Sequence, residues 1–159
     1  MKPKYLEPQF LKNVSYERQK EYLKLHEIKK EKVKQEKIKN DFMVFVKEVW
    51  PEFIEGRHHK EIADKFNQIA KKKINRLIIN MPPRHTKSEF ASFLLPAWMV
   101  GRKPDLKIIQ TSNTTELALR FGRKAKILID SPEYQQIFKT RLREDSQAAG
   151  KWETEQGGE

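Results

Sequence analysis

A lysine and a hydroxyl stand side by side at Lys87-Ser88, directly after a short apolar run and before a helical pattern. A lysine ammonium neutralises phosphate, and a serine hydroxyl is a ligand that Mg²⁺ takes in nucleotide sites. Free backbone N–H groups at the start of a helix complete such a site, because they and the helix dipole attract anions. Residues 81–88, Met-Pro-Pro-Arg-His-Thr-Lys-Ser, are therefore a candidate phosphate-binding loop.

The candidate loop departs from the common P-loop pattern G-x-x-x-x-G-K-[ST], because methionine and threonine stand where that pattern requires glycine. The two prolines of the loop have no N–H group, so an anion cradle must use the amides of residues 84–88. Thr86 is the least favourable position, since a β-branched residue adopts positive φ at a cost that glycine avoids. A second interpretation stays open, in which Lys87 and Ser88 are only the exposed first turn of a helix.

The loop and its surroundings resemble the ATPase domain of the large terminase subunit of tailed bacteriophages. The resemblance covers roughly residues 40–159 and is specific, because several separate segments occur in the order typical of that family. The loop itself is similar to a variant Walker A motif. The matching segments are Trp50-Pro51, His58-His59-Lys60, Arg76–Glu89, Pro96-Ala97-Trp98, Gly101–Asp105, Leu117-Ala118, Phe121-Gly122-Arg123, Ser131–Tyr134 and Gly150–Thr154.

The resemblance implies that the loop binds ATP and Mg²⁺. It assigns nucleotide contacts to Arg84, His85, Thr86, Lys87 and Ser88, and Ser88 would also hold Mg²⁺ as part of Mg-ATP. Arg84 would in addition stabilise charge during phosphoryl transfer, as an arginine finger from the same chain. The implied function is ATP-driven translocation of double-stranded DNA into a procapsid. The implied partners are a portal protein and a small terminase subunit, with a homo-oligomer on the portal, in the host cell cytoplasm.

Two parts of such a motor are not visible in the sequence. The ATPase needs a Walker B strand that ends in acidic residues, and no apolar run with that ending follows residue 112. The nuclease domain of the family, with its metal-binding aspartates, is not seen either. Asp130 and Glu133 are better explained as a helix cap and a first-turn acid than as substitutes. We therefore expect a C-terminally incomplete ATPase domain that is inactive alone.

The candidate loop needs a strand before it and a helix after it. The apolar run 77–81, which is closed by prolines, predicts a buried strand, and the run 106–111 predicts a second. Between them a helical pattern covers residues 87–100, bent or divided at Pro96. Strand, helix and strand with short connections predict a βαβ unit. The expected fold class is therefore α/β, with a P-loop NTPase-like parallel sheet and flanking helices.

Further helices are expected on both sides of this unit. Residues 58–73 carry apolar side chains at helical spacing, and Asn113–Glu116 is a capping signal for a helix that ends near Ile129. Ser131 is expected to cap a short helix that ends at Phe138, and the tail from residue 141 is weakly patterned. With no cysteine or acidic residue at ligand spacing, the paired histidines 58 and 59 indicate a helix start or adenine-side packing rather than a metal site.

The first forty residues differ from the rest. They are rich in Lys and Glu, which predicts a long solvated helix from about Ser15 into the forties. Apolar residues recur at helical spacing only from Ile38, and Pro51 stops the helix. The glutamates lie at salt-bridge spacing from the lysines, so a solvated face is favoured over a DNA-binding one. We divide the chain into a charged helical extension, residues 1–40, and a partial ATPase domain, residues 41–159.

Composition limits the remaining classes of function. Lys and Arg total 33 against 22 Asp and Glu, a net charge of +11 that favours a polyanionic partner. The absence of cysteine excludes disulfides, thiolate zinc sites and cysteine nucleophiles. No apolar stretch is long enough to span a bilayer and no signal-like segment opens the chain, so neither membrane insertion nor secretion is expected. The alternative function is a basic, helical nucleic-acid-binding module without ATPase activity.

We predict that the 159-residue chain hydrolyses ATP no faster than the buffer background, because no Walker B acid is visible to hold Mg²⁺ and orient water. Phosphate release measured with repurified protein checks this. A Mg²⁺-dependent turnover that disappears in Lys87→Ala would contradict the prediction.

Overall fold

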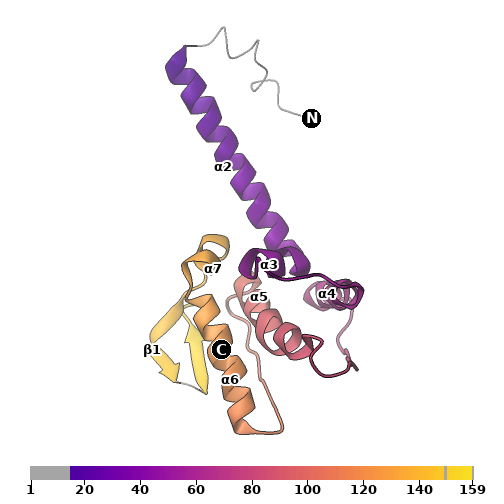
Figure 1. Ribbon diagram of the computed structural model, residues 1–159. Helices are drawn as coiled ribbons and strands as arrows, with labels where there is room; N and C mark the ends of the chain where they lie inside the picture. Colours follow the sequence, from indigo (N-terminus) through magenta and orange to yellow (C-terminus); the bar gives the residue numbers. More distant parts are fainter. Residues whose placement is uncertain (1–14, 149, 159) are drawn as a thin grey trace. The chain divides into compact units, whose positions relative to one another are not determined.

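The computed structural model describes residues 15–148 and 150–158. The chain divides into two compact units, residues 1–37 and 38–159. Figure 1 shows the second unit as helices with one small sheet. The elements are α2 (Tyr16–Asn40), α3 (Phe42–Val49), α4 (Arg57–Ala70), the π-helix η2 (Glu89–Leu94), α5 (Leu95–Arg102), α6 (Thr115–Ile129), α7 (Pro132–Ile137), β1 (Leu142–Ala148) and β2 (Lys151–Thr154).

The predicted parallel sheet is wrong. Within the described residues the sheet consists of β1 and β2 alone, an antiparallel pair with Leu142 opposite Thr154 and Ala148 opposite Lys151. The fold is therefore mainly helical and is not the P-loop NTPase-like α/β fold that the sequence suggested. This sheet is formed by the tail after residue 141, whose sequence is only weakly patterned.

The two segments expected to be strands explain the error. Residues 77–81 and 106–111 alternate between inward and exposed positions, which is the period of an extended chain. Ile78 and Ile109 are the outward members, 85% and 88% exposed. Neither segment forms a backbone ladder with any other described segment. The segments are therefore not the buried strands that their apolar runs predicted, because one face of each is exposed and neither has the neighbouring strand that a ladder requires.

The prediction of one helix from about Ser15 to Pro51 is also wrong, because the helix is interrupted at Asp41. Asp41 has an extended backbone, and its Oδ1 accepts hydrogen bonds from the backbone N–H groups of Met43 and Val44. Asn67 of α4 adds to this junction, since its Oδ1 accepts from the Phe42 N–H at 2.8 Å. Asp41 is thus the N-cap of α3 and starts a new helix at the point where packing begins.

The described part of the first unit, residues 15–37, is the charged helix that the sequence predicts. Its side chains are polar around the whole circumference, and the largest aliphatic ones, such as Val33, are largely exposed. No helix in the described residues combines the length and the apolar character needed to cross a membrane. The predicted extension before residue 15 lies outside the described residues.

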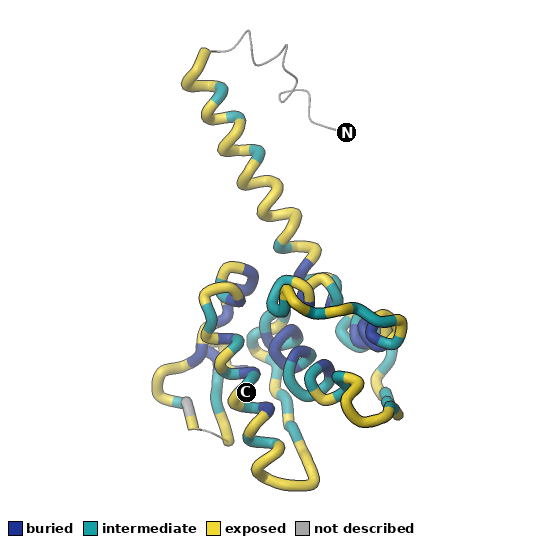
Figure 2. The backbone as a smooth tube through the Cα atoms, in the orientation of Figure 1, coloured by how far each residue is buried: buried dark blue, intermediate teal, exposed yellow. Residues whose placement is uncertain are grey.

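The core of the second unit is built around aromatic rings. Phe42 is fully buried and meets Phe66 of α4, Phe90 of η2 and Trp98 of α5 edge to face, with ring centroids 5.0, 5.4 and 5.5 Å away. The Trp98 indole N–H donates to the Ile38 carbonyl at 3.0 Å, so this buried polar group is satisfied. The buried positions, dark blue in Figure 2, lie on the inward faces of these helices.

The remaining helices start where the sequence predicts. Thr114 caps α6 by accepting from the Leu117 N–H, and Ser131 caps α7 by accepting from the Tyr134 N–H. Asp130 is the C-cap residue of α6 and Glu133 lies in the first turn of α7, as expected for both. The helix after the loop begins at Lys87 and runs through η2 into α5, in which Pro96 is in the first turn.

Replacing Gly101 by alanine is expected to destabilise the fold by about 1–3 kcal/mol through overpacking. An added Cβ would lie 2.5 Å from both the Phe138 ring and the Tyr134 hydroxyl oxygen, and both residues are fully buried. Gly122→Ala in α6 is the control, because its Cβ would meet nothing within 4 Å. Urea unfolding measures both, and equal stability of the two variants would contradict the packing described here.

Candidate functional site

The candidate loop has an unusual backbone. Arg84 has a φ of 64° and Thr86 a φ of 57°, which is the left-handed region that glycine normally occupies. The helix begins at Lys87, so the two left-handed residues stand immediately before its first turn. Alternation of left-handed residues with ordinary ones turns successive N–H groups toward one point and forms a concave anion-binding nest.

The first N–H groups of this loop have no partner in the part of the chain that the structure describes. Those of Arg84, His85 and Thr86 donate no hydrogen bond to any described residue. The next two amides, of Lys87 and Ser88, belong to the first turn of the helix, where backbone N–H groups have no partner inside the helix. The five residues expected to bind nucleotide therefore form one continuous row at a helix start.

Three polar side chains of the loop also have no partner among the described residues. Within residues 15–148 and 150–158, the side chains of Arg84, Lys87 and Ser88 form no ion pair or hydrogen bond. Arg84 and Ser88 are exposed and Lys87 is half-buried. The nearest acid in the sequence, Glu89, is engaged by Lys124 of α6 at 2.8 Å. This ion pair reduces the repulsion that a carboxylate beside the loop would exert on a phosphate.

The conformation of Thr86 is linked to a histidine on another element. The Gly56 N–H donates to His59 Nδ1 at 2.8 Å, and His59 Nε2 lies 2.6 Å from Thr86 Oγ1. Thr86 Oγ1 donates in turn to the His85 carbonyl at 2.6 Å. Since His59 Nδ1 accepts, the ring proton of a neutral imidazole is on Nε2 and points at the threonine. In all three hydrogen bonds the donor lies on the side of Gly56 and the acceptor on the side of His85, so they form a chain from the start of α4 to the loop.

His59 is held by its surroundings. It lies in the first turn of α4, is only 6% exposed, and its ring contacts Phe53 and Phe90 with centroids 4.8 and 5.1 Å away. Burial lowers the pKa of His59, and the neighbouring His58 and His85 lower it further while Glu55 opposes them. His59 is therefore neutral at physiological pH, as its hydrogen bonds require.

The other two histidines lie beside this link. The His58 ring centroid is 3.8 Å from that of His59 and 5.8 Å from that of His85. His85 Nδ1 donates to the Pro83 carbonyl at 2.8 Å, while His58 Nε2 is buried with no hydrogen-bond partner among the described residues. In the part of the chain that the structure describes, no three His, Asp or Glu side chains gather as metal ligands would. The helix-start role expected of the histidine pair is confirmed for His59 by its bond to Gly56.

Sequence reasoning missed the two contacts that shape the loop. Neither the His59 to Thr86 bond nor the Lys124 to Glu89 ion pair follows a local spacing, since 27 and 35 residues separate the partners. The sequence offered one signal for the first contact. The histidine pair 58–59 lies upstream of the loop, and the loop has Thr86 where the P-loop pattern has glycine.

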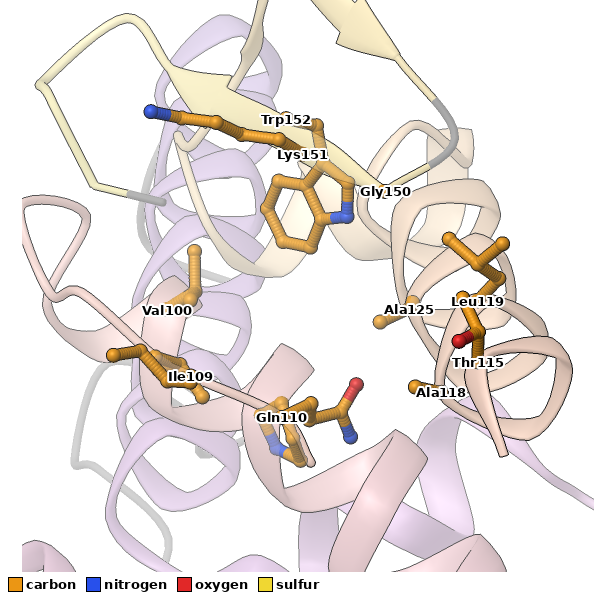
Figure 3. Close-up of a pocket in the computed structure, with 13 residues that line it drawn as sticks. Val100, Ile109, Gln110, Thr115, Ala118, Leu119, Ala125, Gly150, Lys151 and Trp152 are labelled. Carbon is orange, nitrogen blue, oxygen red and sulfur yellow. The ribbon is translucent and has the colours of Figure 1, made fainter. Parts of the chain in front are cut away.

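A separate apolar pocket of about 450 Å³ lies away from the loop. In Figure 3 Trp152 of β2 covers one side, Ala118 and Ala125 of α6 another, and Ile109 of the extended segment a third. None of its 13 lining residues belongs to residues 81–88. Its lining is mainly apolar, with Lys151 as its one charged residue, so it is poorly suited to a triphosphate.

Acidification is expected to destabilise the fold through His59. Because the pKa of His59 is lower in the folded chain than its ordinary value near 6.5, the unfolded chain takes up the proton first as the pH falls below that value. The free energy of unfolding then falls by at most about 1.4 kcal/mol per pH unit until the folded pKa is reached. Above pH 6.5 or so, this contribution is fully present.

Urea unfolding of the wild-type chain and His59→Gln between pH 7.5 and 5.0 measures this effect. The difference between the two curves measures the contribution of His59. Parallel curves would contradict a buried, neutral His59.

Comparison with models of protein families, with curated proteins and with solved structures found no match for this chain.

Proposed function

We propose that this chain is the ATP-binding part of a viral DNA-packaging terminase large subunit. One observation carries the proposal: Arg84 and Thr86 adopt positive φ directly before a helix, and the N–H groups of residues 84–86 donate to no described residue. The strain of two left-handed residues without glycine is typical of functional loops. The sequence resemblance supports the assignment to a terminase large subunit. The loop conformation supports a phosphate-containing ligand.

The ligand is a nucleotide held by its phosphates. The amides of residues 84–88 donate to phosphate oxygens, and the positive end of the helix dipole adds to the attraction. Lys87 supplies the mobile positive charge, and Ser88 supplies the hydroxyl that holds Mg²⁺ in Mg-ATP. Lys87 and Ser88 make no other ion pair or hydrogen bond within the described residues, so binding requires no existing bond to break.

Arg84 has a second role in the proposal. Its guanidinium is exposed and engages no described side chain, so it can turn toward a developing charge on the transferred phosphoryl group. Phosphoryl transfer drives double-stranded DNA into the procapsid, and the net charge of +11 suits a protein that works on a polyanion. The portal protein and the small terminase subunit are the partners we propose, in the host cell cytoplasm, with several copies assembled on the portal.

Lys87→Ala tests the proposal. Removing the ammonium is expected to weaken Mg-ATP binding at least about tenfold, because a charge-assisted contact to phosphate is worth about 1.5–3 kcal/mol. Lys107→Ala is the matched control, since it removes the same charge from an exposed position on the extended segment 106–111.

Isothermal titration calorimetry with Mg-ATP measures all three proteins. Equal affinity of the Lys87→Ala and wild-type chains would overturn the proposed site. A thermal shift gives a second reading, because a ligand that binds only the folded chain raises its melting temperature.

A further inference from the structure

We propose that His59 is a positioning residue of the phosphate-binding loop: by donating its Nε2–H to Thr86 Oγ1, it holds residue 86 in the left-handed conformation that the nest requires. The inference rests on the proposed function and adds to it a residue outside the loop. It explains how a threonine stands where the common P-loop pattern has glycine.

The hydrogen-bond network leaves no ambiguity about the direction of donation. The Gly56 N–H occupies the lone pair of His59 Nδ1 at 2.8 Å, so a neutral ring carries its proton on Nε2. The hydroxyl proton of Thr86 is used toward the His85 carbonyl at 2.6 Å, so Thr86 Oγ1 accepts from His59 at 2.6 Å. The threonine side chain is thereby fixed on both sides, and its backbone with it.

The donor is rigid enough to act in this way. His59 is 6% exposed and packed against the rings of Phe53 and Phe90. Phe90 also lies in the turn that follows Thr86, because its N–H donates to the Thr86 carbonyl at 2.9 Å. The same histidine therefore touches the loop through Thr86 and the first turns of the helix through Phe90.

A glycine would adopt positive φ at residue 86 without help, and that difference provides the test. With Thr86 present, binding of phosphate should depend on the donor at residue 59. With glycine at residue 86, the dependence should disappear. A histidine that only stabilises the core would weaken both backgrounds equally.

Two substitutions of His59 separate its two bonds. In His59→Asn the side-chain oxygen replaces Nδ1 and keeps the bond to Gly56, but no atom reaches Thr86. In His59→Gln the amide nitrogen replaces Nε2 and keeps a donor for Thr86. His58→Asn is the matched control, because His58 Nε2 has no hydrogen-bond partner to lose.

Calorimetry with Mg-ATP on the full chain gives the first result. We expect His59→Asn to lose about tenfold in affinity, His59→Gln to stay within about threefold of wild type, and His58→Asn to be unaffected. In the Thr86→Gly background, His59→Asn should have no further effect. Equal losses for His59→Asn in both backgrounds, or none in either, would overturn the positioning role. If the wild-type chain binds no Mg-ATP, the proposed function is wrong and the positioning role falls with it.

A second pair of variants leaves His59 in place and covers the case in which His59→Asn does not fold. Thr86→Val removes the hydroxyl while keeping the shape, and Thr86→Ser keeps the hydroxyl. We expect about a tenfold loss of Mg-ATP affinity for the valine variant and a smaller loss for serine. Imidazole ¹⁵N spectra should find the Nε2–H tautomer of His59 in wild type. An Nδ1–H tautomer, or equal affinities of the valine and serine variants, would overturn the inference.

Discussion

The burial of Phe42 is the interaction on which the rest of the second unit depends. Its ring meets one aromatic side chain from each of three further elements, so α4, η2 and α5 converge on a single fully buried residue. Edge-to-face contacts of this kind restrict the angle as well as the distance between helices. The start of α4 and the start of the helix after the loop are consequently brought together. His59 and Thr86 stand at those two starts, which is why a bond can form between residues so far apart in sequence.

The hydrogen bond between His59 and Thr86 affects which backbone conformation the loop adopts. A left-handed conformation at a residue other than glycine costs about 1–2 kcal/mol, which is comparable to the net contribution of one hydrogen bond. At Thr86 the two effects occur together, and the helix-cap histidine offsets the strain of the β-branched residue. The loop thus keeps two left-handed residues without a glycine, and the N–H groups of residues 84–86 donate to no described residue. A site for phosphate in this chain would depend on the packing of α4 as much as on the loop itself.

Elements that are specified by neighbouring residues could be predicted from the sequence. Thr114 and Ser131 start their helices because each side chain accepts a hydrogen bond from an N–H three residues later. Asp41 does the same for α3, but its capping signal was hidden inside a continuous helical pattern. The segments 77–81 and 106–111 are extended, but they were predicted wrongly as buried, paired strands, because a short apolar run reveals neither which side chains face solvent nor whether a neighbouring strand exists. In the candidate site, Lys87 and Ser88 could be found from their position before a helix, whereas His59 could not, since its partner lies 27 residues away.

The central claim is that the amides of residues 84–88 receive phosphate, and backbone amide shifts in a ¹H–¹⁵N correlation spectrum test it most directly. Titration of the full chain with Mg-ATP should shift the amide signals of Arg84 to Ser88 the most, with the His59 side chain following through Thr86. With the chain already saturated with inorganic pyrophosphate, adding Mg-ATP should cause smaller further shifts, because both ligands would occupy the same nest. Shifts spread along the lysine-rich helix α2, with none in the loop, would contradict the account.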